Sequence, residues 1–511
     1  MAVQATTRKG TALLGASSWT RLDLPAISIT VILLAGLAYR LTLMLTHGGY
    51  EGVDGGAYLN SAHLVLGRGV ASLDFPRPPL APGWTLAPFI TLWGDDVGFK
   101  LWNALASWAL LPAFTLLASL VLTRWQTVFA AAFLSVDLLL AEMMATGSLP
   151  ILGFAYLALI IWGVFKLAES ERIHWPAAVT TAACVPLLAY TNETATGLGI
   201  ITIPVMLLCI WRMKSAEAAW HGLRPLLIGG LLALTAYRYY VQVAPGSGLT
   251  AYGGHLIYPA MSPAILQLLL VVPVGVWALR KLTDYRLRTL AVMTLTVAAL
   301  MPWFSFDETI INIFYRARYL VEIPLTILLT ALVWPWLTRK DFGPVLWGGA
   351  AVVFALLSVG YAHQFHVQAA LSDMVSQDGA KAISYIEAHP KPGRVITNAS
   401  SLSLWVSALT RLDTRYTFAA QPPAKWASDD AAVRCLLGWE AAGCDIAASS
   451  ARIQPSYLLI ERRFQIKNLK SNPIPTRVYG APITFPWDLK MPQGWQHVER
   501  VGTVDLWEWI G

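Results

Sequence analysis

The sequence predicts a mainly α-helical, polytopic membrane protein of about eleven transmembrane helices with an extracytoplasmic α/β domain at its C-terminus. Composition is the first reason, because 56% of the 511 residues are hydrophobic, 13% are charged and the mean hydropathy is +0.53. That balance leaves too little polar surface for a soluble chain of this length. The second reason is a series of long apolar windows, and the third is a fall in hydropathy after residue 363.

Apolar windows of about 17 to 25 residues, long enough to cross a bilayer as helices, follow one another through the first two thirds of the chain. They lie at roughly 25–45, 98–122, 127–145, 149–168, 176–191, 196–212, 225–243, 263–280, 289–304, 319–337 and 343–362. The segment Leu80–Trp93 is shorter and is interrupted by two prolines and a glycine, so we expect it to be interfacial or re-entrant. The first window is too long for the apolar part of a cleavable signal peptide, and we expect it to be retained.

Basic residues gather on one side of these windows, as they do in cytoplasmic loops. That side holds Arg8, Lys9, Arg21, Arg124, Lys166, Arg172, Arg212, Lys214, Arg224, Arg280, Lys281, Arg286, Arg288, Arg339 and Lys340, and the other side's short loops hold Arg68, Arg77, Arg316 and Arg318. An odd number of spans then predicts a cytoplasmic segment (1–24), a membrane domain (25–362) with a first outer loop at about 47–97, and an extracytoplasmic soluble domain (363–511). We expect a bacterial inner or plasma membrane location. This orientation depends on Leu80–Trp93 not spanning.

The C-terminal domain is predicted from short β-type runs beside helical ones. The runs Arg394–Thr397, Tyr457–Ile460 and Thr503–Trp507 favour strands, and Asp378–His389 and Leu402–Thr410 favour helices. The domain also holds Cys435 and Cys444, whereas the other two cysteines lie within predicted spans. A disulfide between them matches an oxidising compartment, and two free thiols are the alternative.

The first outer loop carries motifs whose order is informative. An arginine near the end of the first span (Arg40) precedes Asp54 and Tyr58, and Arg77-Pro78-Pro79-Leu80 follows. Arg316-Ala317-Arg318-Tyr319-Leu320 comes late in the chain, just before a proline. This order resembles the glycosyltransferase C superfamily, and within it the protein O-mannosyltransferase and lipid A aminoarabinose transferase branch. The resemblance covers roughly residues 25–362.

The resemblance implies an enzyme that transfers a sugar from a polyprenyl-phosphate-linked donor, with inversion, to an extracytoplasmic lipid, glycan or protein. This chain departs from the family pattern at two places. Asp54 is followed by two glycines where many relatives have a second acidic residue, and Thr146-Gly147 stands where relatives often have Thr-Asp. Both departures weaken the expectation of a divalent metal, so no metal ligand and no cofactor are predicted.

Sugar transfer at the outer interface needs a base for the acceptor hydroxyl, and Asp54 lies at a suitable depth for that role. Asp before Gly-Gly-Ala-Tyr also fits a helix N-cap, and the two roles are compatible. The leaving phosphate needs positive charge, for which Arg316 and Arg318 are the first candidates and Arg77 the next. The alternative for these arginines is snorkelling towards lipid headgroups.

Four further residues are candidates for substrate binding. Glu142 and Glu193 are acids near the outer ends of predicted spans, where an ion pair that fixes helix packing is the alternative. Tyr58 follows Asp54 closely, and His255 lies in an aromatic outer loop, where a solvated surface histidine is the alternative. Asp137 lies deeper in the same window as Glu142, and there a structural hydrogen bond is the favoured interpretation.

Other functional classes find less support. The net charge of +7 is explained by cytoplasmic loops and anionic headgroups, and no nucleic-acid-binding, zinc, P-loop or Rossmann motif accompanies it. A transporter or lipid-glycan flippase is the main alternative to an enzyme, but no two halves of the sequence look like transporter repeats. A structural or sensory membrane protein is the second alternative.

Overall fold

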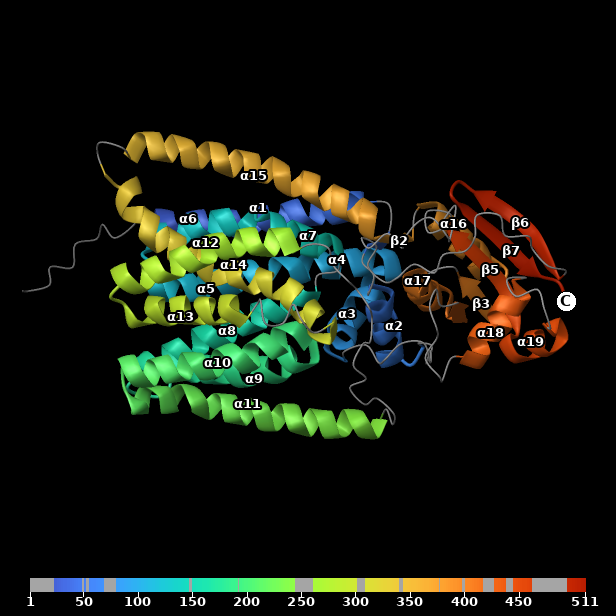
Figure 1. Cartoon of the computed structure of the whole chain (residues 1–511), viewed down its shortest axis with the longest axis horizontal. Coiled ribbons are helices and arrows are strands. Elements are labelled where there is room, and N and C mark those ends of the chain that lie inside the picture. Colours follow the sequence, from blue (N-terminus) through green and yellow to red (C-terminus); the bar gives the residue numbers. More distant parts are fainter. Residues whose placement is uncertain are drawn as a thin grey trace, which may run out of the picture.

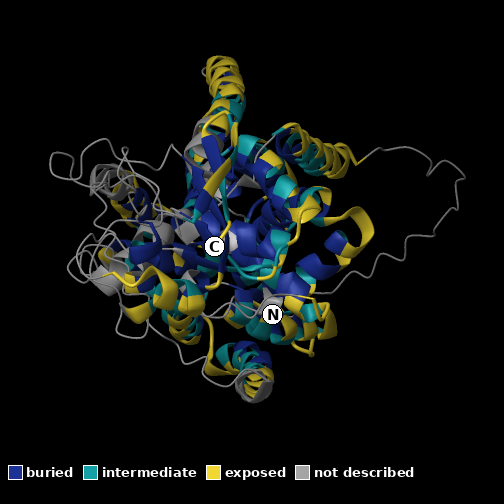
Figure 2. Cartoon of the chain, turned by 90° about the vertical axis from the view of Figure 1, so that its right-hand side faces the viewer, coloured by how far each residue is buried: buried dark blue, intermediate teal, exposed yellow. Residues whose placement is uncertain are grey.

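The protein is an elongated helical bundle with a small α/β domain at one end (Figure 1). The computed structural model describes residues 23–47, 50–51, 55–68, 80–146, 149–191, 193–243, 261–300, 308–339, 343–375, 377–397, 400–416, 427–437, 444–461 and 494–511. Seen along the long axis from the domain end, buried residues gather at the centre and exposed residues lie around the rim (Figure 2). The exposed side chains include many large apolar ones, such as Leu231, Leu356 and Val359, as expected for a bundle that faces lipid.

Within the described residues, every apolar window predicted from the sequence falls on one helix or on two consecutive helices. The bundle contains α1 (Leu24–Thr46), α2 (Gly55–Val65), α3 (Leu80–Trp93), α4 (Asp95–Trp108), α5 (Leu110–Val121), α6 (Arg124–Ser135), α7 (Leu138–Thr146), α8 (Leu149–Glu169), α9 (Trp175–Thr191), α10 (Glu193–Met213), α11 (Ala216–Val243), α12 (Met261–Lys281), α13 (Tyr285–Leu300), α14 (Glu308–Leu337) and α15 (Gly343–Ser372). Polytopic helical architecture is therefore confirmed in outline.

The number of spans is less sharply defined than the helices themselves. Within the described residues, five helices are long and apolar enough to cross a membrane, or six if the bent pair α6–α7 forms one span. The prediction of eleven spans stays a prediction, since helices such as α9, with 17 residues, are marginal in length. The 14 residues of α3 give a helix of about 21 Å, shorter than a hydrocarbon core of about 30 Å. This length agrees with a non-spanning segment.

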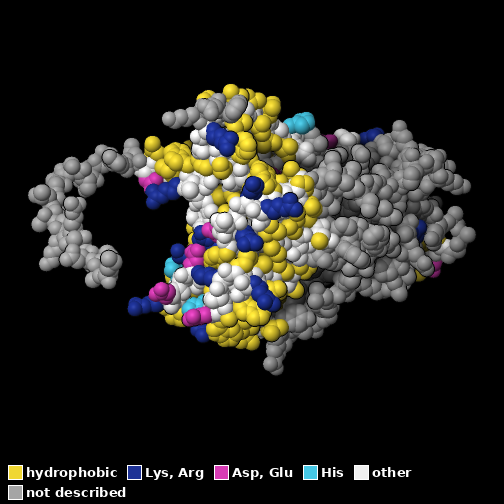
Figure 3. Space-filling view, turned by 60° about the vertical axis from the view of Figure 1, so that its left-hand side comes forward, with side chains coloured by type: hydrophobic (Ala, Val, Ile, Leu, Met, Phe, Trp, Pro, Cys, Tyr) yellow, Lys and Arg dark blue, Asp and Glu magenta, His cyan; other side chains and the backbone are white. Residues whose placement is uncertain are grey.

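The end of the bundle remote from the C-terminal domain carries ion pairs between helix termini. Arg124 at the start of α6 lies 2.6 Å from Asp23 before α1, and Arg286 near the start of α13 lies 2.6 Å from Glu169 at the end of α8. Figure 3 turns this end forward and shows Lys and Arg side chains across it, beside a broad hydrophobic surface. The predicted basic side is thus one physical end of the bundle. That this end faces the cytoplasm stays a prediction.

The window 127–145 was predicted as one continuous span, but the structure breaks it into α6 and α7, which meet at 44°. Breaking a helix in an apolar environment frees backbone groups that need new partners. Asp137 supplies an acceptor, because its Oδ1 accepts hydrogen bonds from the N–H groups of Leu139 and Leu140 at 2.9 and 3.2 Å. The structural role expected for Asp137 is confirmed.

The last carbonyl of α6 accepts a hydrogen bond from a side chain of α1. Arg40 is fully buried, and its guanidinium donates hydrogen bonds to the carbonyl of Ser135 at 3.3 Å and to that of Gly36 at 3.1 Å. The guanidinium also lies 5.2 Å from the ring centre of Tyr361 in α15. Arg40, singled out by the family resemblance, therefore joins α1, α6 and α15 at the break.

The C-terminal domain is a five-stranded mixed sheet of strand order β4-β3-β5-β7-β6. Its strands are β3 (Arg394–Thr397), β4 (Asp413–Tyr416), β5 (Pro455–Glu461), β6 (Trp495–Val501) and β7 (Val504–Trp509), and its helices are α16 (Gln377–Ala388), α17 (Ser400–Thr410), α18 (Ala427–Leu436) and α19 (Ile446–Ile453). β3 pairs in parallel with β4 and β5, while β7 pairs antiparallel with β5 and β6. The predicted strands and helices of this domain are all present.

Helices cover both faces of the sheet. On one face, Ile396, Leu458 and Ile460 pack with residues of α18. On the other, Val395, Tyr457 and further strand residues share a hydrophobic cluster with α16 and α17. That cluster continues into α2, α3 and α4 of the bundle, so the domain is docked on the membrane part through a common core. We call this cluster the docking core.

Cys435 and Cys444 form a disulfide with their Cα atoms 5.5 Å apart. It joins the end of α18 to the residue before Asp445, whose side chain caps α19 by accepting a hydrogen bond from the Ala448 N–H at 2.9 Å. Among the described cysteines, Cys184 and Cys209 in the bundle are free. The disulfide therefore links the two helices that cover the outer face of the sheet.

We expect Arg40→Met to lower the free energy of unfolding by about 1–3 kcal/mol, because the Ser135 carbonyl loses its donor inside the bundle. Unfolding of the purified protein in mixed detergent micelles measures this. Arg124→Met is the matched control, since Arg124 is 75% exposed and its ion pair is worth less than about 1 kcal/mol. Equal losses in the two variants would contradict the role of Arg40 at the helix break.

We expect Cys435→Ser to destabilise the C-terminal domain by about 2–3 kcal/mol, the loop-closure estimate for a short disulfide loop. Limited proteolysis across a urea series, with cleavage in the domain followed by mass spectrometry, measures the change. Cys209→Ser is the control because its thiol is free. An unreduced sample of the native protein that carries two alkylatable thiols at positions 435 and 444 would disprove the bond.

Candidate functional site

The predicted site residues belong to segments in the half of the bundle nearer to the C-terminal domain. β1 (Tyr50–Glu51) and the start of α2 flank Asp54, Glu142 lies near the end of α7, and α14 carries Arg316 and Arg318 in its first half. In Figure 1 α2, α3 and α4 border the domain, and α7 and the start of α14 lie behind them in the half of the bundle nearer to it. Asp54, Arg77 and His255 lie outside the described residues. Only the backbone is described for Glu142, Glu193, Arg316 and Arg318, so their predicted roles stay predictions.

The loop that carries Asp54 is held at both of its ends. On one side, β1 pairs antiparallel with β2 (Asp373–Val375), the strand that leads into the C-terminal domain, with Tyr50 opposite Val375 and Glu51 opposite Asp373. On the other side, α2 begins at Gly55, so Asp54 directly precedes the first helical residue.

α2, α3 and α4 form a tightly packed unit. A Cβ on Gly83 of α3 would lie 2.5 Å from the Ser61 hydroxyl of α2, and a Cβ on Gly98 of α4 would lie 2.7 Å from the Phe89 carbonyl of α3. Glycine at these two positions lets the backbones approach closely. The unit therefore gives the loop and the C-terminal domain a common support.

Tyr58 lies within this unit. Its ring is 6% exposed, belongs to the docking core and packs edge-on against Trp102 of α4 with 6.3 Å between the ring centres. These are packing contacts, which the sequence pattern alone did not distinguish from a contact with substrate. The substrate role predicted for Tyr58 stays a prediction.

A histidine–aspartate pair joins α2 to α4. His63 is fully buried and its Nε2 lies 2.9 Å from Oδ1 of Asp95, while Nδ1 has no hydrogen-bond partner in the described structure. Asp95 is the first residue of α4, and Arg68 lies 3.9 Å from it. Glu387 of α16 adds a second carboxyl here, and burial, reinforced by the charge of Asp95, raises the pKa of Glu387.

Lys100 is a buried cation at this end of the bundle that the sequence patterns did not single out. It is 7% exposed, donates a hydrogen bond to the His47 carbonyl at 3.0 Å and pairs with Asp96 at 3.0 Å. The sequence signal that could have identified Lys100 is its place inside the apolar window 98–122. A charge within an apolar helix is costly unless it is paired or has a function. Lys100 holds the end of α1 three residues before β1.

The end of α7, where Glu142 lies, is fixed by polar contacts from two other helices. Asn103 of α4 is fully buried and donates a hydrogen bond to the Met144 carbonyl at 3.2 Å. Tyr361 of α15 donates to the Met144 sulfur at 3.7 Å. Asn103 thereby satisfies a carbonyl that a helix C-terminus leaves without an internal partner. The backbone that carries Glu142 is therefore held between α4 and α15.

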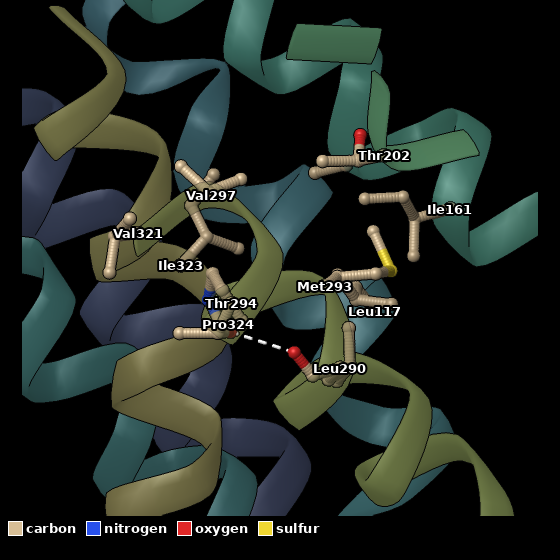
Figure 4. A pocket seen from close by; sticks show the side chains of 11 residues that line it. Leu117, Ile161, Thr202, Leu290, Met293, Thr294, Val297, Val321, Ile323 and Pro324 are labelled. Carbon is tan, nitrogen blue, oxygen red and sulfur yellow. Dashed lines mark hydrogen bonds between the residues drawn. The ribbon is translucent and has the colours of Figure 1, made fainter. Parts of the chain in front are cut away.

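An apolar pocket lies deeper in the bundle between α5, α8, α10, α13 and α14 (Figure 4). Leu117, Ile161 and Met293 line it together with Val321, Ile323 and Pro324, the α14 residues that follow Arg318 by three to six positions. Thr294 lies at the wall and directs its hydroxyl to the Leu290 carbonyl at 2.7 Å, which leaves an apolar surface. The pocket therefore offers an apolar surface within about two helical turns of Arg318 along α14.

The described residues contain no group of three or more His, Cys, Asp or Glu side chains arranged to hold a metal ion. Two half-buried acids of the bundle are used by neighbouring groups. Asp95 faces His63, and Asp137 caps α7. Metal dependence is therefore not assigned to any described residue.

No protein-family model matches the sequence, and no curated protein matches it. Solved structures do match the fold. ArnT from Cupriavidus metallidurans bound to undecaprenyl phosphate has a TM-score of 0.58 at 13% identity, over 96% of this chain and 98% of that one. The Archaeoglobus fulgidus oligosaccharyltransferase tethered with an acceptor peptide has a TM-score of 0.53 at 10% identity, over 88% of this chain and 70% of that one.

A third match extends the same pattern. The mycobacterial arabinofuranosyltransferase AftD has a TM-score of 0.54 at 15% identity, over 98% of this chain but 40% of that larger one. All three are glycosyltransferases of the C type. The chain has the glycosyltransferase C fold, and the resemblance predicted from the motif order is confirmed at the level of fold.

We expect Lys100→Met to loosen the end of α1, because the His47 carbonyl loses a charged donor. Amide hydrogen exchange in a peptide covering the end of α1 and β1 should become roughly tenfold faster, which corresponds to about 1.4 kcal/mol of local stability. Lys381→Met is the control, since Lys381 is 69% exposed on α16. Unchanged exchange in the Lys100 variant would contradict this anchoring role.

Proposed function

We propose that this chain is a membrane glycosyltransferase that takes a sugar from a polyprenyl-phosphate-linked donor and transfers it to an extracytoplasmic acceptor. The observation that carries the proposal is the likeness to ArnT bound to undecaprenyl phosphate, which extends over nearly the whole of both chains and so includes both the bundle and the C-terminal domain. The acceptor class is left open among lipid, glycan and protein, and the proposed location is a bacterial inner or plasma membrane.

In the proposed reaction the Asp54 carboxylate takes the proton of the acceptor hydroxyl as the acceptor oxygen bonds to the anomeric carbon. The bond from that carbon to the donor phosphate breaks on the opposite side, which inverts the anomeric configuration. The electron pair leaves with the polyprenyl phosphate. The products are the glycosylated acceptor and the free lipid phosphate, and the carboxyl proton then passes to water.

The phosphate is proposed to lie near Arg316 and Arg318, with Arg77 as a further cation, because guanidinium groups match phosphate oxygens and stabilise the charge that develops there. The pocket that begins at Val321 supports this placement, since it offers an apolar wall for the isoprenoid chain within one to two helical turns of Arg318. Glu142, Glu193, Tyr58 and His255 remain candidates for contacts with the sugar or acceptor.

A lipid-carried donor also agrees with the proposed topology. The start of α2, which follows Asp54 in the chain, lies towards the domain end of the bundle, and the basic helix ends lie at the other. With the basic end in the cytoplasm, a nucleotide sugar made there would not reach the site, whereas a sugar attached to a membrane lipid would. A transporter or flippase is the alternative function, for which many spans are equally ordinary.

We expect Asp54→Asn to lower kcat about 10²–10⁴-fold while the protein stays folded, because the amide cannot accept the hydroxyl proton. Transfer from a panel of radiolabelled polyprenyl-phosphate sugars to membrane extracts measures this. Asp445→Asn is the control, because asparagine can still cap α19 in the C-terminal domain. Equal turnover by wild type and Asp54→Asn would remove Asp54 as the base. A wild-type protein inactive with every donor would favour the transporter.

A further inference from the structure

Cations at the end of the bundle remote from the C-terminal domain fall into two classes. Arg286 belongs to the first class, because its guanidinium donates hydrogen bonds at 2.6 Å to both Asp284 and Glu169. Cations of the second class have no ion-pair partner among the described residues, and three of them lie where α10 ends and α11 begins: Arg212, Lys214 and Arg224. Their charge can therefore attract an anion from outside the chain.

Each arginine of this group lies over an indole ring. The guanidinium carbon of Arg212 is 5.0 Å from the ring centre of Trp211, and that of Arg224 is 5.4 Å from the ring centre of Trp220. Trp211 and Trp220 are 50% and 46% exposed, as indole rings at a membrane–water interface commonly are. Because a stacked guanidinium uses its flat face, its N–H edge stays available for phosphate oxygens.

Lys214 brings a third positive charge to the same turn of the chain. Its Nζ lies 5.3 Å from the ring centre of Tyr285 at the start of α13. The acid of this turn, Glu217, is 85% exposed and lies 3.7 Å from His221. We call residues 211–224 the α10–α11 corner, and it carries three Lys or Arg residues and one acid. The corner is therefore suited to a negatively charged ligand.

An apolar surface continues from this corner along both helices. Leu208 of α10 lies one turn before Arg212, and Leu227 and Ile228 of α11 lie one turn beyond Arg224, and all three apolar side chains are about half exposed. Each turn advances by about 5.4 Å, so cations and apolar side chains follow one another in depth. Figure 3 shows Lys and Arg beside hydrophobic surface at this end. A phospholipid has the same order of headgroup and chains, whereas free phosphate has no apolar part.

We propose that the α10–α11 corner binds the phosphate of an anionic phospholipid while the acyl chains of that lipid lie along α10 and α11. Anionic headgroups are attracted to Lys and Arg near a membrane surface, and each such residue is worth about fivefold in affinity. The proposal is independent of the proposed sugar transfer, because it uses no residue of the candidate site. It gives these cations a ligand in addition to any part in orienting the chain.

Native mass spectrometry of the purified full chain, titrated with phosphatidylglycerol or phosphatidylcholine, tests the proposal. We expect phosphatidylglycerol to bind at least tenfold more tightly, and the triple variant Arg212→Gln, Lys214→Gln, Arg224→Gln to lose at least tenfold of that affinity. Inorganic phosphate should not compete, because it lacks acyl chains. Equal affinity of the wild type for the two lipids, or displacement of the lipid by inorganic phosphate, would overturn the proposal.

Two further variants separate a site from the general positive charge of this end. Arg124→Gln, Arg280→Gln and Lys281→Gln together remove as many charges from α6 and α12, which lie apart from α11 in Figure 1, and should change the affinity less than twofold. Trp211→Leu with Trp220→Leu keeps every charge and should weaken binding at least threefold, because the guanidinium groups lose their rings. Equal losses in the two triple variants, or unchanged binding in the Trp variant, would overturn the site.

Discussion

The docking core is the contact on which the geometry of the candidate site depends. It joins strands and helices of the C-terminal domain to α2, α3 and α4 in one hydrophobic cluster, so the domain and the upper bundle share buried surface. Fully buried rings such as Phe99 and Trp405 each remove a large apolar area from water and fix orientation as well. Without this cluster, the domain would be joined to the bundle by α15, β2 and the β1–β2 pairing alone, and its position relative to α2, α3 and α4 would be loosely determined.

A second constraint comes from the apolar surroundings of the bundle, where backbone groups freed by a broken helix must find partners. The break between α6 and α7 meets this requirement with two charged side chains, Arg40 on the carbonyl side and Asp137 on the amide side. Asn103 does the same at the far end of α7. Polar residues that look functional in an apolar sequence are in these cases structural, and they orient the short helix that carries Glu142.

The sequence predicted the features that depend on composition and local pattern. Apolar windows located the helices, Leu80–Trp93 was recognised as too short to span, and three strands of the C-terminal domain were identified from runs as short as Arg394–Thr397. It did not predict the break at Asp137, because the window 127–145 remains apolar through it. Nor did it predict the contact of Gly55 with Trp405. The two residues are 350 positions apart, and the local sequence around either one gives no sign of the other. The role of Lys100 was also missed, because its partner is the backbone carbonyl of His47, which no side-chain pattern marks.

The likeness to ArnT at only 13% identity has a physical explanation, because the fold and the chemistry depend on different constraints. A bilayer restricts spanning segments to helices of limited length, so many sequences can satisfy one arrangement, and the fold is retained while side chains change. The chemistry depends on few groups whose placement must be accurate to a fraction of an ångström. In this chain the two elements that precede and follow residues 52–54 both contact the C-terminal half: β1 pairs with β2, and α2 belongs to the docking core. Separation of the domain beyond α15 from the bundle would therefore remove contacts of both β1 and α2.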